Sequence, residues 1–147
     1  MMCKYEEKAI GIFEQGNNCA QSVFAAFAED YGLDEKQALL VASSFGGGMG
    51  GMKETCGALT GAFMAAGLKY GYGQIQPEQD VSEIKSAHNK RIQAIAEDFR
   101  KSCGALTCRD LLALIEADAK WSEMKKPCSV IVRNACRIMK DMEEQNI

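Results

Sequence analysis

Apolar residues recur at three- and four-residue steps along most of this chain, which is the spacing of one face of an α-helix. Glycine, proline and side chains that favour helix starts divide this pattern into segments. No segment alternates apolar and polar residues over the length of a strand. The pattern predicts helices over residues 3–13, 19–31, 35–42, 54–70, 78–102, 108–115 and 128–142. We therefore predict an all-α fold, a single-domain helical bundle of about six to seven helices over residues 1–147.

The composition indicates an ordinary soluble globular protein, because 47% of the residues are hydrophobic, 25% are charged and only two are prolines. The formal net charge of −3 lacks the positive field that phosphate groups require, so we predict no nucleic-acid partner. The first residues, MMCKYEEK, carry charges where a signal peptide would be apolar. No segment approaches the roughly 20 apolar residues of a membrane helix. We expect a cytoplasmic protein with no membrane insertion.

Seven cysteines are many for a chain of this size in a reducing compartment, where structural disulfides rarely persist. Their odd number leaves at least one thiol outside any complete set of internal disulfides. In such a setting, clustered cysteines more often bind metal or carry out redox chemistry. The cysteines are therefore the candidate functional residues of this sequence.

Position within the predicted helices separates the seven cysteines into two groups. A thiolate is stabilised at a helix N-terminus, where free amides and the helix dipole favour negative charge. Four cysteines fall in predicted first turns, and we assign them to a redox-active or metal-binding site: Cys19, Cys56, Cys108 and Cys128. The others lie in a frayed terminus, in a last helical turn and on an apolar helix face: Cys3, Cys103 and Cys136, respectively. We regard these three as additional to the site.

A run of glycines, GGGMGG over residues 46–51, interrupts the helical pattern ahead of Cys56, since each glycine inside a helix costs about 1 kcal/mol relative to alanine. Its amides could bind an anionic thiolate or cluster, or the run could be a tight connection between helices. It lacks the lysine and the serine or threonine of a nucleotide-binding P-loop, which excludes that ligand class. Five glycines of this region are candidate cofactor-binding residues: Gly48, Gly50, Gly51, Gly57 and Gly61.

His88 is the single histidine, and it lies among charged and amide side chains of the long predicted helix. We expect it on a solvated face. With one histidine, two-histidine zinc sites and bis-histidine haem are excluded within one chain, and no Cys-x-x-Cys-His motif is present for covalent haem.

Four motifs spread over nearly the whole chain resemble those of a known family. They are Cys19 in NNCAQSV, the segment CGALTGA from Cys56, the segment CRDLL from Cys108, and Cys128 after a proline. Together they resemble the C_GCAxxG_C_C family of redox-active proteins. The resemblance implies redox activity at a site made of the same four cysteines that helix position selects. A related module accompanies an iron–sulfur centre in the split-Soret cytochromes, although this chain has no haem motif.

Three functions are compatible with these cysteines. The first, which we favour, is an electron-transfer protein whose four thiolates hold an iron–sulfur or other metal centre, because such clusters usually have four cysteine ligands. A four-cysteine zinc site has the same donors, but the usual closely paired cysteines are absent. The second is a thiol–disulfide oxidoreductase or redox sensor, in which Cys56 attacks and another cysteine resolves the mixed disulfide. The third is a non-catalytic helical binding protein.

These functions differ in cofactor and partner. The first requires an iron–sulfur cluster or another metal, whereas the other two require no cofactor. A redox function requires a partner, which would be a redox protein or a small thiol substrate. We keep a homodimer as a candidate assembly.

Overall fold

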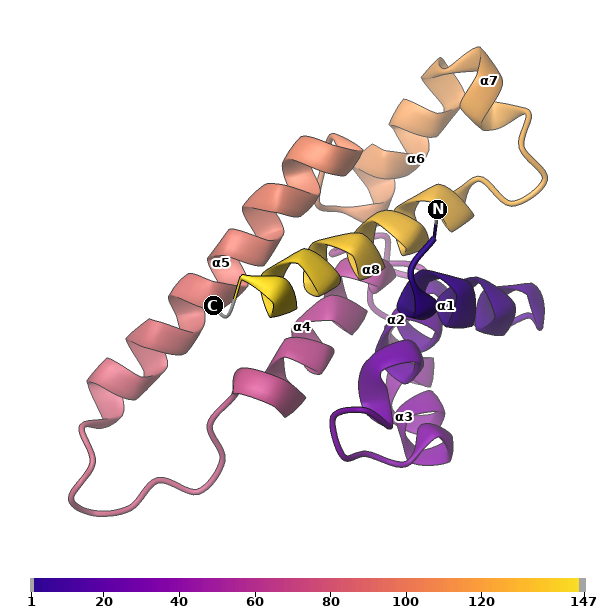
Figure 1. Ribbon diagram of the computed structural model, residues 1–147. Coiled ribbons are helices and arrows are strands. Elements are labelled where there is room, and N and C mark those ends of the chain that lie inside the picture. Colours follow the sequence, from indigo (N-terminus) through magenta and orange to yellow (C-terminus); the bar gives the residue numbers. More distant parts are fainter. Residues whose placement is uncertain (1, 146–147) are drawn as a thin grey trace.

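The computed structural model describes residues 2–145, which form α-helices and one short 3₁₀ helix, η1 (Ser43–Phe45) (Figure 1). The α-helices are α1 (Lys4–Glu14), α2 (Cys19–Ala28), α3 (Glu35–Ala42), α4 (Gly57–Tyr70), α5 (Val81–Cys103), α6 (Cys108–Ala117), α7 (Ala119–Ser122) and α8 (Cys128–Glu144). No strand occurs in this part of the chain, so the prediction of an all-α bundle is confirmed. The structure adds α7 to the predicted helices, because a helix of 4 residues is too short to show a period.

Polar side chains before several helices fix where those helices begin. Asn18 forms a capping box with Gln21: its Oδ1 accepts from the Gln21 amide at 2.8 Å, and Gln21 Oε1 accepts from the Asn18 amide at 2.9 Å. Further helices begin at side chains that accept from a first-turn amide: Asp34, Asp80, Thr107 and Asp118. These local signals explain why the starts of α2, α3 and α6 agree with the sequence pattern.

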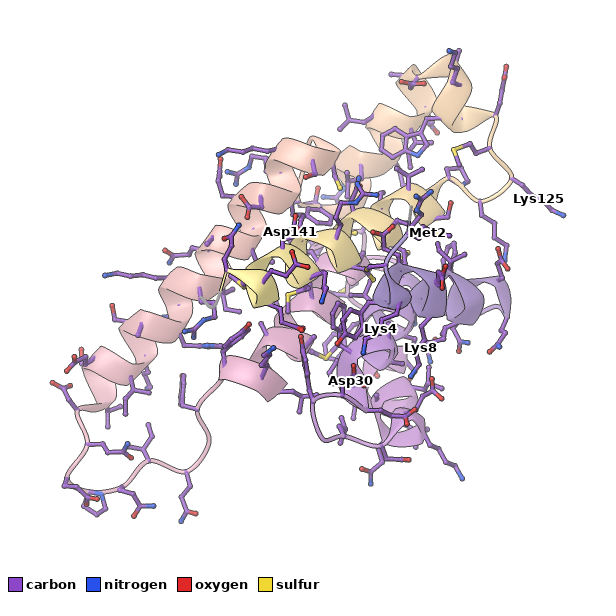
Figure 2. The ribbon with its side chains drawn as sticks, in the orientation of Figure 1. Met2, Lys4, Lys8, Asp30, Lys125 and Asp141 are labelled. Carbon is purple, nitrogen blue, oxygen red and sulfur yellow. The ribbon has the colours of Figure 1, made fainter. Side chains whose placement is uncertain are left out.

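The central helix of the bundle is α2, of which nearly every residue is buried and which packs against α1, α3, α4 and α8. Tyr5 holds α1 on α2 by stacking on Phe27, with ring centroids 4.2 Å apart. The Tyr5 hydroxyl also donates to Asp30 Oδ2 at 2.7 Å, and Lys4 Nζ lies 2.9 Å from the same oxygen. Figure 2 shows Lys4 and Asp30, with Lys8, gathered on this surface.

Two glycines allow α4 to pack close against α2. A Cβ at Gly61 would lie 2.8 Å from the Ala20 carbonyl oxygen and 3.0 Å from Val23 Cβ. A Cβ at Gly57 would lie 3.1 Å from the Phe45 carbonyl oxygen and 3.2 Å from the Ala20 amide nitrogen. Backbone atoms cannot move aside as the end of a flexible side chain can. Gly57 and Gly61 therefore set the distance between the two helices.

The helix predicted over residues 54–70 begins later than expected, at Gly57. Residues 53–56 instead run antiparallel to residues 106–109, with an isolated bridge between Thr55 and Thr107. Within this pairing, the Cys56 amide donates to the Leu106 carbonyl at 2.9 Å. The sequence pattern missed this boundary because the partner segment lies far away along the chain.

Helix α5 follows a loop, residues 71–80, and packs on α4 and α8. Its buried residues are Ile95, Phe99 and Cys103, all in the C-terminal half, and Gly104 ends the helix with a φ of 99°. Figure 1 shows α8 crossing the front of the bundle, with α5 on one side and α1 to α3 on the other. Within residues 2–145, no helix has the length and apolar character needed to cross a membrane.

Replacing Gly61 by alanine should destabilise the protein, because the added methyl group would meet the backbone of α2. We expect the free energy of unfolding to fall by about 1–3 kcal/mol, the usual cost of overpacking. Urea denaturation followed by circular dichroism measures this change. Gly67→Ala is the matched control in the same helix, because nothing lies within 4 Å of a Cβ there. That variant should be neutral or more stable by up to about 1 kcal/mol. Equal stability of the two variants would refute the steric role of Gly61.

Candidate four-cysteine site

Three helices of the bundle begin at a cysteine, and α4 begins directly after one. Cys19, Cys108 and Cys128 are the first residues of α2, α6 and α8. Cys56 is the residue immediately before α4. The predicted positions of these cysteines at helix starts are therefore confirmed. All four line one cavity of about 180 Å³, so the fold brings them together.

Backbone pairing places Cys56 beside Cys108. The Cys108 amide donates to the Glu54 carbonyl at 2.7 Å, and the Arg109 amide donates to the Lys53 carbonyl at 3.1 Å. With the bond from the Cys56 amide, these hydrogen bonds hold the two segments antiparallel at the point where α4 and α6 begin. Two cysteines far apart in sequence thus have a fixed spacing.

Glycines at two positions leave room for cysteine side chains. A Cβ at Gly57 would lie 3.5 Å from Cys19 Cβ, so the start of α4 lies directly against the start of α2. A Cβ at Gly48 would lie 2.7 Å from Cys108 Cβ and 2.7 Å from the Glu54 amide nitrogen. Any other residue at position 48 would displace Cys108 or the paired backbone.

The glycine run has a left-handed backbone over consecutive residues. Those with φ between 61° and 80° are Gly47, Gly48, Met49, Gly50 and Gly51. The amides of Gly51, Lys53 and Glu54 donate to carbonyls of the same loop at 2.9–3.0 Å, so they are not directed at a bound anion. Among the candidate cofactor-binding glycines, Gly48 and Gly57 line the cavity, whereas Gly50, Gly51 and Gly61 lie outside its lining.

Cys128 is the thiol of this site that ionises most readily. A hydrogen bond from the Cys19 thiol and the positive charge of Lys53 outweigh burial and lower the pKa of Cys128 to about 7. The same hydrogen bond, together with burial, raises the pKa of Cys19. Near neutral pH, the two residues therefore share one negative charge, a thiolate on Cys128 that accepts from the thiol of Cys19.

Burial dominates the ionisation of the other two cysteines. Cys56 is 5% exposed, and desolvation raises its pKa to about 12, although the backbone amides of Leu59 and Ala58 act in the opposite direction. Burial also raises the pKa of Cys108 against the charge of Lys53. Cys128, rather than the Cys56 expected from sequence, is thus the thiol suited to nucleophilic attack. The reason is that lost hydration outweighs the effect of the helix start at Cys56.

The remaining three cysteines lie outside the cavity. Cys136 is fully buried within α8, and burial raises its pKa. Cys103 ends α5, where Asn134 Nδ2 donates to its sulfur at 3.6 Å. Cys3 immediately precedes α1 and packs against the core, so the expectation of a frayed terminus there is wrong. A helix start alone is therefore not sufficient to identify a site cysteine.

The sequence did not reveal which residues surround the sulfur atoms. Apolar side chains of α6 and α8 form one wall of the cavity: Leu111, Leu112, Ile115 and Ile131. Their helical spacing predicts burial but not the cavity that they face. Lys53 also lines the cavity, and its position two residues after the glycine run is the signal that could have identified it.

His88 is not among the residues that line the cavity. Its ring packs edge-on against Tyr72 with centroids 5.8 Å apart, and Arg91 Nη1 lies 3.5 Å from its Nδ1. His88 lies among exposed residues of α5, as expected for a solvated face, but is itself half-buried because the loop after α4 brings Tyr72 against it.

The donor atoms of the cavity suit a sulfur-bound group of several atoms. Its metal-ligating side chains are the four thiols, with no carboxylate or imidazole in the lining. Among residues 2–145, no three cysteine, histidine, aspartate or glutamate side chains are placed to hold a single metal ion. The cavity is much larger than the roughly 10–15 Å³ that one water molecule requires. Four thiols are the donor set that either an iron–sulfur cluster or a four-cysteine zinc site would use.

The sequence of this chain is similar to known proteins over the region that contains these cysteines. The model of one protein family, described as "Putative redox-active protein (C_GCAxxG_C_C)", matches residues 17–142, which include the cysteines of the cavity. A protein of Archaeoglobus fulgidus, described as "Uncharacterized protein", is 28% identical over 138 residues, which cover 92% of this chain and 90% of the relative. No solved structure matches this chain.

Alkylation of the reduced, metal-free protein should identify Cys128 as the reactive thiol. Iodoacetamide should react with Cys128 faster than with Cys56 at neutral pH, because the thiolate is the nucleophile. The rate should rise with pH around a midpoint near 7. Peptide mass spectrometry identifies the modified residue. In Cys19→Ala the midpoint should move up toward the ordinary range of thiols, whereas in the control Cys103→Ala it should not move. An unchanged midpoint in Cys19→Ala would contradict the role of the hydrogen bond.

Proposed function

This chain belongs to the C_GCAxxG_C_C family of redox-active proteins, and we propose that it transfers electrons through an iron–sulfur cluster. The proposed ligands are Cys19, Cys56, Cys108 and Cys128. The observation that carries the proposal is a cavity whose metal-ligating side chains are these four thiols. Cysteine thiolates are the usual ligands of iron–sulfur clusters, and a bound cluster would supply a one-electron couple.

Four helix N-termini around the cavity support a negatively charged centre. Helices α2, α4, α6 and α8 have between 10 and 17 residues each. A helix dipole places about half a positive charge at the N-terminus, so each dipole favours a thiolate at its own cysteine. Lys53 adds a full positive charge that acts on Cys108 and Cys128. These charges offset the repulsion among four ligating thiolates.

The apolar wall of the cavity would also affect the reduction potential of a bound cluster. Leu111 and Ile115 of α6 and Ile131 of α8 are buried and line the same cavity as the four cysteines. Such a wall limits the access of water to the site. Solvent access and the hydrogen bonds to sulfur are the main means by which a protein adjusts the reduction potential of a metal centre.

A thiol–disulfide function is the second candidate, and the pair of Cys128 and Cys19 favours it. The Cys128 thiolate would attack one sulfur of a substrate disulfide and release the other as a thiolate. Cys19 would then lose its proton and attack Cys128, which yields a Cys19–Cys128 disulfide and the reduced substrate. This reaction leaves Cys56 and Cys108 without a role. The cluster accounts for all four cysteines, so we prefer it.

Protein purified without oxygen should contain iron and acid-labile sulfide in equal amounts and show a visible absorption that a reductant bleaches. Serine substitution of any of the four proposed ligands should remove most of the iron. Cys3→Ser is the matched control, because serine is a favourable residue before a helix and Cys3 lies outside the cavity. A colourless anaerobic protein that forms a reversible Cys19–Cys128 disulfide would refute the cluster and favour the thiol–disulfide function.

Removing the charge of Lys53 should make the cluster harder to reduce, because reduction adds negative charge next to this lysine. Lys53→Met should lower the reduction potential by roughly tens of millivolts, since about 59 mV corresponds to a tenfold change in a one-electron equilibrium. A spectroscopic redox titration measures the potential. Lys53→Arg keeps the charge and should keep the potential. A Met variant with the potential of the unmodified protein would show that Lys53 does not act on the centre.

A further inference from the structure

A second hollow lies beside the four-cysteine cavity, between α1 and the loop that leads into α8. Its volume is about 600 Å³, within the roughly 300–1,000 Å³ of small-molecule sites. Figure 2 labels Met2 and Lys125 from its lining: Met2 lies near the start of α1, and Lys125 extends outward from the loop before α8. Residues from both ends of the chain therefore form this hollow.

One part of the hollow is apolar. Ile10 and Phe13 line it from α1, and Met124 lines it from the opposite loop. Met124 is 41% exposed. Because the side chain of methionine is flexible and polarizable, it can pack against a bound apolar group. These side chains provide a surface against which a hydrocarbon or aromatic group can pack.

The remaining side chains make the hollow cationic. Lys125, Lys126 and Arg133 contribute positive charges, against the single carboxylate of Glu14. Arg133 also forms an ion pair with the buried Glu6, since its Nε lies 3.5 Å from Glu6 Oε2. The ion pairs within residues 2–145 leave both lysines without a carboxylate partner.

Lys126 connects the apolar and cationic parts of the hollow. Its Nζ lies 5.4 Å from the centroid of the Phe13 ring and 3.5 Å from the Phe13 carbonyl oxygen. A charged group is thus held next to the aromatic surface rather than fully out in solvent. A ligand that packs on Phe13 would have its acidic group within reach of this ammonium.

We propose that this hollow binds a small amphipathic anion, with its apolar part on α1 and Met124 and its acidic group at Lys125 and Lys126. A purely ionic ligand would leave the apolar surface uncovered, and a neutral apolar ligand would supply no negative charge opposite Lys125 and Lys126. A carboxylate, a sulfonate and a phosphate ester all carry the negative charge that this site would bind.

The position of the hollow relates it to the redox site. Ser129 lines the hollow, whereas Cys128, one residue before it, lines the four-cysteine cavity. Successive residues of a helix point about 100° apart, so the first turn of α8 separates the two spaces. A ligand in the hollow would therefore lie beside the turn that presents Cys128.

Calorimetry with the full chain tests this proposal. The probe is 8-anilinonaphthalene-1-sulfonate, an aromatic anion, and we expect saturable binding at one site. N-phenyl-1-naphthylamine has the same rings without the sulfonate and should bind at least about tenfold more weakly. Amide NMR signals of Ser129 and Ile10 should shift on binding, whereas those of α3 should not. Absence of saturable binding, equal affinity for the neutral probe, or shifts confined to other helices would overturn the proposal.

Matched variants sharpen this test. The double substitution Lys125→Gln and Lys126→Gln should weaken binding of the anion by about tenfold or more, because it removes the charge that faces the sulfonate. Lys36→Gln with Lys85→Gln removes the same charge from exposed positions outside the hollow and should leave the affinity unchanged. Met124→Glu places a carboxylate in the apolar part and should abolish binding. Circular dichroism verifies that each variant is folded. The proposal is overturned if the Lys125→Gln/Lys126→Gln double variant and the Met124→Glu variant both bind the anion with wild-type affinity.

Discussion

A side chain at residue 61 would collide with the backbone of α2, and this steric limit governs the arrangement of the site. Helix α4 reaches α2 only because Gly57 and Gly61 present no side chain to it. Their contact places the start of α4, with Cys56, against the start of α2, with Cys19. The pairing of residues 53–56 with 106–109 then adds the start of α6, and α8 packs on α2 and α4 to add Cys128. The site therefore follows from backbone contacts more than from the cysteines themselves.

Gathering four ionisable sulfur atoms beside an apolar wall creates an electrostatic problem. Burial raises the pKa values of Cys56 and Cys108, and the hydrogen bond to Cys128 together with burial raises that of Cys19, while negative charge on neighbouring sulfur atoms acts in the same direction. One charge is tolerated, on Cys128, because a thiol and a lysine stabilise it. A cluster bound at these four cysteines, as proposed, would displace the protons of the other three thiols, so its binding would depend on pH. The helix N-termini and the charge of Lys53 lower the free energy needed to deprotonate these thiols, but they do not remove it.

Local signals in the sequence were sufficient for much of the fold. The pattern predicted helices from Cys19 and Cys108, where Asn18 and Thr107 cap α2 and α6, and the helical spacing predicted the all-α class. The predicted start of α4 was wrong, because the position where this helix begins depends on the pairing of Thr55 with Thr107. Position at a helix start selected the cysteines of the cavity, but Cys3 also precedes a helix and lies elsewhere. The order of thiol acidity was not predictable, because it depends on burial and on contacts between distant residues.

The connection between α6 and α8 decides which way Cys128 faces, and no short-range pattern encodes this orientation. Trp121 Nε1 donates to the Pro127 carbonyl at 2.9 Å, which ties the end of the loop to α7 just before α8 begins. From there, helix geometry assigns each residue a direction. Cys128 and Ile131, one turn apart, face the four-cysteine cavity, while Ser129 faces the cationic hollow. The same turn of helix thus presents Cys128 to the four-cysteine cavity on one side and Ser129 to the cationic hollow on the other, so a change in the tilt of α8 would move the lining of both spaces.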